Sequence, residues 1–171
     1  MAVHDDRTMA DLIDGRLDWA TTKEIISNPK DPNRFDQVVR ILQERVKWSE
    51  PILLPLAEHL YIVLKGGRHV VKCDCGQEFG QADENWKHHA RVYVRDTEES
   101  LRELYRPYEH CSPEWMELRE FYCPRCFALL EVEAVPPGYP VVFDFKPDLE
   151  GFYEKILGRA LPRSPGVKSV A

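Results

Sequence analysis

Two closely spaced cysteine pairs constrain the fold of this chain more than any other feature of its sequence. The first pair is Cys73-Asp-Cys75 and the second is Cys123-Pro-Arg-Cys126. A tight turn can direct two thiolates to the same side, which supplies half of a tetrahedral site, and a second such turn completes it. Zn2+ takes four thiolate ligands at about 2.3 Å, and sites closed in this way are structural rather than catalytic. The spacing therefore predicts a structural zinc site held by Cys73, Cys75, Cys123 and Cys126.

Other uses of these thiols agree less well with the surrounding sequence. The first residues lack the basic and apolar regions of a signal peptide, so we expect a cytoplasmic chain whose cysteines stay reduced. A redox dithiol is expected to open a helix, whereas sequence typical of strands flanks both pairs. The pattern also allows His69, His88 or His89 to replace one thiolate. Cys111 is unpaired, and a free cysteine more often packs as a small apolar residue.

The segments around the cysteine pairs are typical of β-hairpins. Residues 61–64 and 69–72 are rich in apolar residues and are joined by Gly66-Gly67, a pattern of two strands with a glycine turn. Cys73 follows the second of these strands, and residues 128–135 are predicted to leave the second pair as another strand. A hairpin at each pair is the pattern of a zinc ribbon, in which the metal replaces much of a missing core.

Helical patterns lie before, between and after these strands. Asp31-Pro32 is predicted to cap and start an amphipathic helix in the N-terminal segment. Between the cysteine pairs, a capping pattern at Asp96 and the start signal Ser112-Pro113 predict two short helices. Asp148 is predicted to cap a last helix, which Gly158 ends.

These patterns together predict an α+β fold with a zinc-ribbon-like β core. We expect a helical N-terminal segment at 1–50, a zinc-ribbon-like domain at 51–140 with a helical insertion at about 83–120, and a C-terminal helix with an extended tail at 141–171. The tail from Arg159 is rich in Pro, Ser and Gly and is expected to be extended or disordered unless a partner holds it. Several short apolar elements are too small to bury their own faces, which indicates a chain that lies against something larger.

Charge and hydropathy argue against two classes of partner. The 171 residues include 29 acidic and 23 basic side chains, giving a formal charge of -6, whereas binding to nucleic acid requires a basic face. No run approaches the roughly 18 apolar residues that a membrane-spanning helix needs. We therefore expect neither nucleic acid nor membrane as a partner.

A search for a reaction centre finds no convincing candidate. The sequence lacks a glycine-rich phosphate loop, a serine nucleophile elbow and a His-Glu-x-x-His pair. His88 and His89 are adjacent, and neighbouring helical positions point about 100° apart, so one site rarely receives both. Glu131 and Glu133 alternate along a strand and are expected on an exposed face. We therefore expect no catalytic or cofactor-binding residues in this chain beyond the metal ligands.

A series of ordered motifs runs along nearly the whole chain. The motifs are Leu12-Ile-Asp-Gly-Arg-Leu-Asp-Trp19, Asp31-Pro-Asn-Arg-Phe-Asp36, Leu53-Leu-Pro-Leu-Ala-Glu-His-Leu-Tyr-Ile62, Val71-Lys-Cys-Asp-Cys-Gly76, Glu84-Asn-Trp86, Tyr93-Val-Arg-Asp-Thr97, Phe121-Tyr-Cys-Pro-Arg-Cys126 and Leu130-Glu-Val-Glu-Ala-Val-Pro-Pro137. In these motifs the chain resembles the gamma subunits of acetone carboxylases and the related subunits of acetophenone-type ketone carboxylases. One departure is Phe127, since many zinc knuckles carry glycine directly after the second cysteine.

The resemblance implies a cytoplasmic complex with two copies each of alpha, beta and gamma chains, (αβγ)2. Such complexes use ATP to activate bicarbonate and the ketone by phosphorylation and then join them, giving acetoacetate from acetone. The resemblance also implies ATP, Mg2+ and Mn2+ sites in the large subunits and Zn2+ in the gamma chain, at the four cysteines of the two pairs.

The sequence thus predicts a noncatalytic zinc subunit of an ATP-dependent ketone carboxylase. Three alternatives remain beside it. One is the small subunit of an acetophenone-type enzyme, and another is a free-standing zinc ribbon that binds nucleic acid or a transcription complex. The third is a small metalloenzyme whose zinc keeps an open position and so has only three protein ligands.

Overall fold

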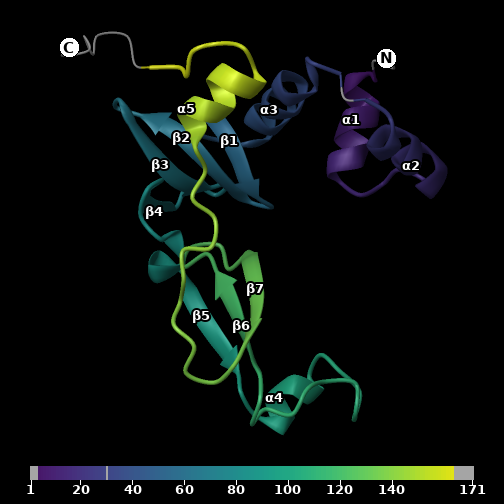
Figure 1. Ribbon diagram of the computed structural model, residues 1–171, viewed down its shortest axis with the longest axis vertical. Coiled ribbons are helices and arrows are strands. Elements are labelled where there is room, and N and C mark those ends of the chain that lie inside the picture. The colour runs from purple at the N-terminus through teal and green to yellow at the C-terminus, as the bar shows by residue number, and fades with distance from the viewer. Residues whose placement is uncertain (1–3, 30, 164–171) are drawn as a thin grey trace.

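Two antiparallel sheets follow one another along the long axis of the molecule, which confirms the expected α+β fold (Figure 1). The computed structural model describes residues 4–29 and 31–163. The helices are α1 (Asp6–Ile13), α2 (Trp19–Ser27), α3 (Arg34–Arg45), α4 (Glu98–Arg102), α5 (Leu149–Gly151), the 3-10 turn η1 (Trp86–His89) and the π-helical turn η2 (Phe152–Ile156). The strands are β1 (Ile52–Ala57), β2 (Leu60–Lys65), β3 (Arg68–Cys73), β4 (Glu78–Gln81), β5 (Arg91–Arg95), β6 (Glu117–Tyr122) and β7 (Leu129–Val135).

The first sheet contains β1 to β4 in sequence order and is covered on both faces. The predicted hairpin is present as β2 and β3, and its turn residues Gly66 and Gly67 both have positive φ, as a tight hairpin turn requires. Val63, with its neighbours on one face, packs against the apolar side of α3. Ile62 and Val71, on the other face, belong to the main core under the C-terminal helix.

The second sheet has the order β5-β6-β7, and its central strand overturns one prediction. Ser112-Pro113 does not start a helix, because residues 117–122 form β6. Glu117, Arg119 and Glu120 of this strand are all buried, and Arg119 pairs with Glu117 at 2.7 Å. The charges that follow Ser112-Pro113 therefore belong to a covered strand. The expected insertion at 83–120 therefore contains η1 and α4 but also β5 and most of β6.

The helices start at, or within a few residues of, the capping residues that the sequence predicts. Asp148 caps α5 as predicted, since its carboxylate accepts a 2.9 Å hydrogen bond from the Gly151 N–H. α3 starts at Arg34 rather than at Pro32, because Asp31 instead accepts the N–H of Asn33 in the preceding turn. The cap of α4 is Thr97, one residue after Asp96. Among the described helices, none is both long and apolar enough to cross a bilayer.

After β7 the chain returns to the first sheet. The tail was expected to be extended or disordered from Arg159, but its first residues are packed against the domain. The hydroxyl of Tyr153 donates a 2.9 Å hydrogen bond to the carbonyl of Leu53, which fixes the C-terminal helix on β1. Arg159 pairs with Asp36 of α3, and Leu161 is buried in the main core. The tail is therefore packed at least as far as Leu161, and the predicted extended residues 164–171 lie outside the described part of the chain.

Three aromatic rings connect the two sheets. Phe79 on β4, Trp86 in η1 and Phe121 on β6 are all buried, and successive ring centroids lie 6.0 and 6.1 Å apart in edge-to-face contacts. Such pairs contribute about 0.5–1.5 kcal/mol beyond the area that they bury. This aromatic bridge belongs to a main core that residues of both sheets share, and the cysteine cluster is a further place where the sheets meet.

A buried lysine fixes the segment that follows β7. Lys87 is 1% exposed, and its ammonium lies 2.6 Å from Glu131, 2.9 Å from Asp144 and 3.3 Å from Glu133. Burial alone lowers the pKa of Lys87, but its hydrogen bonds and charge interactions with these carboxylates outweigh it and leave the pKa raised. The expectation that Glu131 and Glu133 form an exposed face was wrong, because both are turned toward this ammonium.

Candidate metal centre

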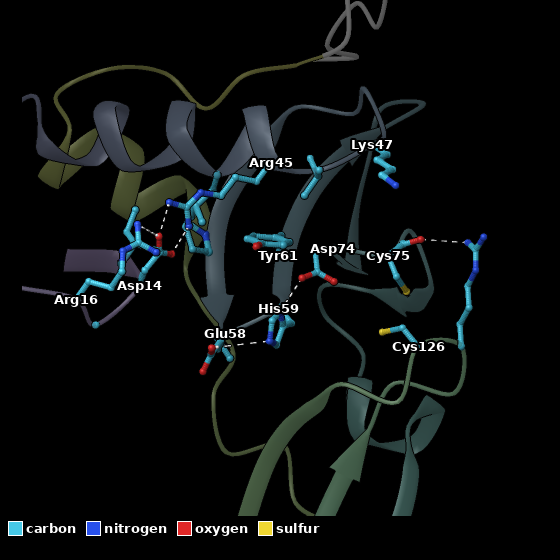
Figure 2. A pocket seen from close by; sticks show the side chains of 17 residues that line it. Asp14, Arg16, Arg45, Lys47, Glu58, His59, Tyr61, Asp74, Cys75 and Cys126 are labelled. Carbon is cyan, nitrogen blue, oxygen red and sulfur yellow. Dashed lines mark hydrogen bonds and ion pairs between the residues drawn. The ribbon is translucent and has the colours of Figure 1, made fainter. Parts of the chain in front are cut away.

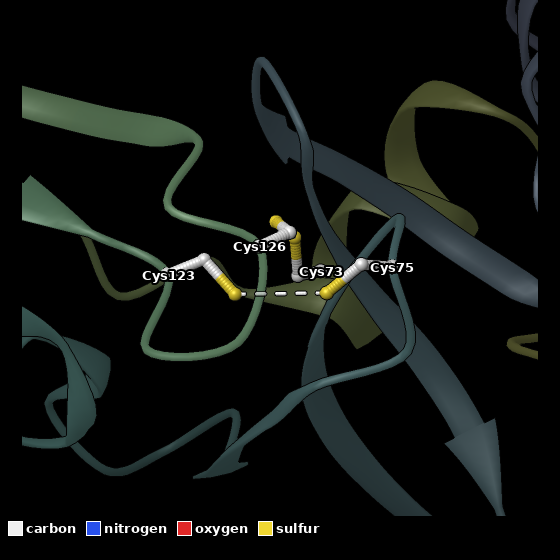
Figure 3. Close-up of side chains that lie close together, drawn as sticks. All are labelled: Cys73, Cys75, Cys123 and Cys126. Atoms are coloured by element: carbon white, nitrogen blue, oxygen red, sulfur yellow. Dashed lines mark hydrogen bonds between the residues drawn. The ribbon is translucent and has the colours of Figure 1, made fainter.

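The two cysteine pairs meet at the junction of the two sheets. Cys73 ends β3 and Cys75 lies in the turn that leads to β4, whereas Cys123 and Cys126 lie in the turn between β6 and β7 (Figure 3). Their four sulfur atoms all lie within 4.8 Å of one another. Each hairpin therefore delivers two thiols to one point, as the spacing of the cysteines predicts.

The distances between the sulfur atoms fit a tetrahedral metal ion. Cys73 Sγ lies 3.8 Å from Cys126 Sγ, and Cys75 Sγ lies 3.6 Å from Cys123 Sγ. Sulfur atoms at 2.3 Å from a tetrahedral zinc ion are about 3.8 Å apart, whereas a disulfide holds them at about 2.0 Å. The four cysteines are free thiols in a geometry suited to a closed four-thiolate site.

Burial and backbone N–H groups shift the pKa values of three of these thiols, those of Cys73, Cys75 and Cys123. Burial raises the pKa of Cys73 and of Cys75. Burial also acts to raise the pKa of Cys123, but hydrogen bonds from the backbone of Cys126 and Arg125 and from neighbouring thiols leave that pKa lowered. A metal binds the thiolate form, so metal binding at this cluster would displace protons and depend on pH.

Several side chains outside the cysteine pairs support the two turns. The indole N–H of Trp48 lies 3.2 Å from the carbonyl of Cys73 and 3.0 Å from that of Asp74. Arg125 donates to the carbonyl of Cys75 at 3.2 Å and so links one turn to the other. Sequence reasoning missed both contacts, because Trp48 and Arg125 have no characteristic spacing from the carbonyls that they reach.

The histidines considered as replacement ligands do not join the cluster. His69 lies on β3, and His88 and His89 lie in η1. In the described part of the chain, the group of side chains able to hold a metal consists of the four cysteines. Cys111 also lies apart, exposed in the connection between α4 and β6.

Phe127 occupies the position where zinc knuckles commonly carry glycine, and its backbone has the conformation that glycine favours. Its φ is 61°, in the left-handed region, while its N–H donates to the carbonyl of Cys123 at 3.0 Å. A bulky residue in this region costs roughly 1–2 kcal/mol. The ring is mostly exposed and lies 5.3 Å from the guanidinium of Arg91, a contact that offsets part of this strain.

Comparing Phe127→Gly with Phe127→Ala separates the strain from the ring contact. Both variants lose the contact with Arg91, but only glycine relieves the strain at positive φ. Part of this gain is lost because glycine makes the unfolded chain more flexible. We expect Phe127→Gly to be more stable than Phe127→Ala by about 1 kcal/mol. Denaturant unfolding of the two metal-loaded chains measures this difference, and equal stabilities would contradict the strain argument.

An open cleft of about 1200 Å3 lies beside the cysteine cluster (Figure 2). Cys75 and Cys126 line one side of it, and Asp14, which pairs with Arg45 at 2.6 Å, lines the other. Tyr61 forms part of its base, and burial raises the pKa of that hydroxyl to about 12. The cysteine cluster is therefore reached from the side of the N-terminal helices.

Comparisons with known proteins agree on one family. The family model described as acetone carboxylase gamma subunit matches residues 46–157. The acetone carboxylase gamma subunit of Xanthobacter autotrophicus is 45% identical over 156 residues, which cover 90% of this chain and 93% of the relative. The acetophenone carboxylase beta subunit of Aromatoleum aromaticum is 29% identical over 118 residues, covering 67% and 84% of the two chains. The resemblance seen in the motifs is thus confirmed, and the chain belongs to the acetone carboxylase gamma subunit family.

Proposed function

We propose that this chain is a noncatalytic, structural zinc subunit of a cytoplasmic, ATP-dependent ketone carboxylase that joins acetone and bicarbonate to give acetoacetate. Its partners are the alpha and beta subunits in an (αβγ)2 complex. These large subunits are proposed to hold ATP, Mg2+ and Mn2+, whereas this chain holds Zn2+ at Cys73, Cys75, Cys123 and Cys126.

The proposal rests mainly on one observation: in a chain of the acetone carboxylase gamma subunit family, four cysteines come together where the two sheets meet. Four thiolates fill all four positions of tetrahedral zinc and leave none for a substrate or a water molecule. The cluster lies where two hairpins from separate sheets meet. A metal at this point stabilises the fold, because its binding free energy becomes folding free energy.

The similarity to an acetophenone carboxylase subunit supports a second substrate. That relative is less similar to this chain than the acetone carboxylase relative, at 29% against 45% identity. We therefore favour acetone. Carboxylation assays of the purified complex with acetone and with acetophenone distinguish the two substrates, and faster turnover of acetophenone would reverse the preference.

The native mass of the assembly that co-purifies with this chain from its own organism tests the proposal. We expect a large complex that contains two copies of this chain and two kinds of larger subunit, with about one zinc ion for each copy of this chain. A species of 19.9 kDa alone would instead favour a free-standing zinc ribbon. A complex without zinc would contradict the assignment of the metal.

A further inference from the structure

The segment 96–116, which connects β5 to β6, forms an arm at the end of the molecule farthest from α1 to α3 (Figure 1). Its only regular element is α4, and the 14 residues between α4 and β6 form neither helix nor strand. Loops longer than about 12–15 residues are uncommon in compact domains and usually have a function of their own.

The base of the arm is fixed to the second sheet. Arg95 on β5 is 7% exposed and donates to the carbonyl of Ser100 at 2.7 Å and to Glu103 at 2.6 Å. Leu101 is the buried residue of α4, and the mostly buried ring of His110 lies against the ring of Tyr105. These contacts fix the conformation of the arm at its base.

Large apolar side chains of the arm are directed into solvent. From Glu103 to Trp115 every residue is exposed except His110 and Pro113, which are partly buried. Tyr108 is 101% exposed and Trp115 is 77% exposed, and Leu104 and Tyr105 are also exposed. Exposed apolar patches of this kind mark interaction sites, and Trp and Tyr are enriched among the residues that contribute most to binding energy.

The charge of the arm selects the kind of partner. Residues 96–116 contain six acidic and two basic side chains, so they carry -4 of the formal charge of -6. The acidic residues are Asp96, Glu98, Glu99, Glu103, Glu109 and Glu114. This negative charge repels nucleic acid and anionic membranes, and it also repels a second copy of the same arm. A protein groove that is apolar at its centre and basic at its rim is complementary to both the rings and the charge.

We propose that the arm docks into such an apolar, Lys- and Arg-rimmed groove on a large subunit of the carboxylase, with Trp115 and Tyr108 as its main contacts. This inference rests on the proposed function, because it names the surface by which the subunit joins its complex. The arm reaches the partner at a distance from the metal cluster, so docking and metal binding are separable by mutation.

The test compares Trp115→Ala and the double variant Glu109→Lys/Glu114→Lys with Trp19→Ala in the full chain, each co-expressed with the large subunits. Trp19 is 70% exposed on α2 and is therefore a matched control for the loss of an exposed indole. We expect Trp115→Ala to weaken binding to the large subunits by about 30-fold, and the charge reversal to weaken it most at low salt. Trp19→Ala is expected to bind as the unaltered chain does.

The controls separate this inference from the proposed function. If the unaltered chain does not co-purify with large subunits, the proposed function fails. If it does, but Trp115→Ala binds equally well or Trp19→Ala loses as much, the assignment of the contact to the arm is wrong. Loss of self-association as the main effect of the arm variants would also overturn it, since a second copy would then be the occupant. Zinc content and melting temperature should be unchanged in all variants, because the replaced side chains are exposed.

Discussion

Replacing Cys123 with serine is expected to release the metal and separate the two sheets. Cys123 is fully buried and contributes one of the four sulfur atoms that lie within 4.8 Å of one another. Without this ligand, the sheets are joined by the main core that includes the aromatic bridge, by the ion pairs of Lys87 and by the chain segments that pass between them. We expect the free energy of unfolding to fall by on the order of 5 kcal/mol or more, which is comparable to the whole stability of a domain of this size.

Metal analysis and thermal unfolding measure this effect, and Cys111→Ser is the matched control. Cys111 is exposed and outside the cluster, so the same chemical change at that position should leave both readouts unaltered. A Cys123→Ser chain that assembles without zinc and melts at the same temperature as the unaltered chain would refute a structural role for the metal.

Replacing Lys87 with methionine is expected to lower the free energy of unfolding by the second-largest amount. The change leaves Glu131, Glu133 and Asp144 close together without the ammonium that they surround. Removing one partner of a buried ion pair costs about 3–5 kcal/mol, and we expect a value near 3 because Glu131 and Asp144 retain contact with solvent. Lys23→Met, on the exposed surface of α2, should be nearly neutral.

Two further measurements identify the ion pairs as the cause. Because the pKa of Lys87 is raised above its ordinary value of 10.5, the ion pairs stabilise the chain fully below that pH and lose their effect as pH rises through the raised pKa. The difference in unfolding free energy between the two chains should therefore stay constant from about pH 7 to about pH 9. Adding Glu131→Gln and Glu133→Gln to Lys87→Met should recover part of the loss. No recovery would indicate that packing of the lysine stem, rather than charge, is responsible.

The sequence predicted the parts of this structure whose signals are local. The cysteine spacing gave all four members of the cluster, and Gly66-Gly67 located the hairpin that leads to Cys73. The cap at Asp148 was also correct, because a cap depends on a few neighbouring residues.

The errors concern residues whose environment is made by distant parts of the chain. Glu131 and Glu133 alternate like residues on an exposed strand, and only the fold brings Lys87 and Asp144 to them. The start signal Ser112-Pro113 predicted a helix, but the chain continues as β6, whose charged residues Glu117 and Arg119 are paired and buried. A pattern of charged residues therefore identifies an exposed face only where no oppositely charged side chain from a distant part of the chain pairs with those residues.

The separation of the two cysteine pairs along the chain also determines when the fold can be completed during synthesis. Cys73 and Cys126 are 53 positions apart, and closing a loop of that length costs about 4 kcal/mol of chain entropy. A ribosome delivers the strands of the first sheet, residues 52–81, well before the last ligand at Cys126. Until Cys126 has been made, a nascent chain therefore contains only two or three of the four cysteines of the cluster. The helix after Asp148, which covers the first sheet, is made later still. Under the proposed function, zinc would then be bound by newly made chains rather than by finished complexes.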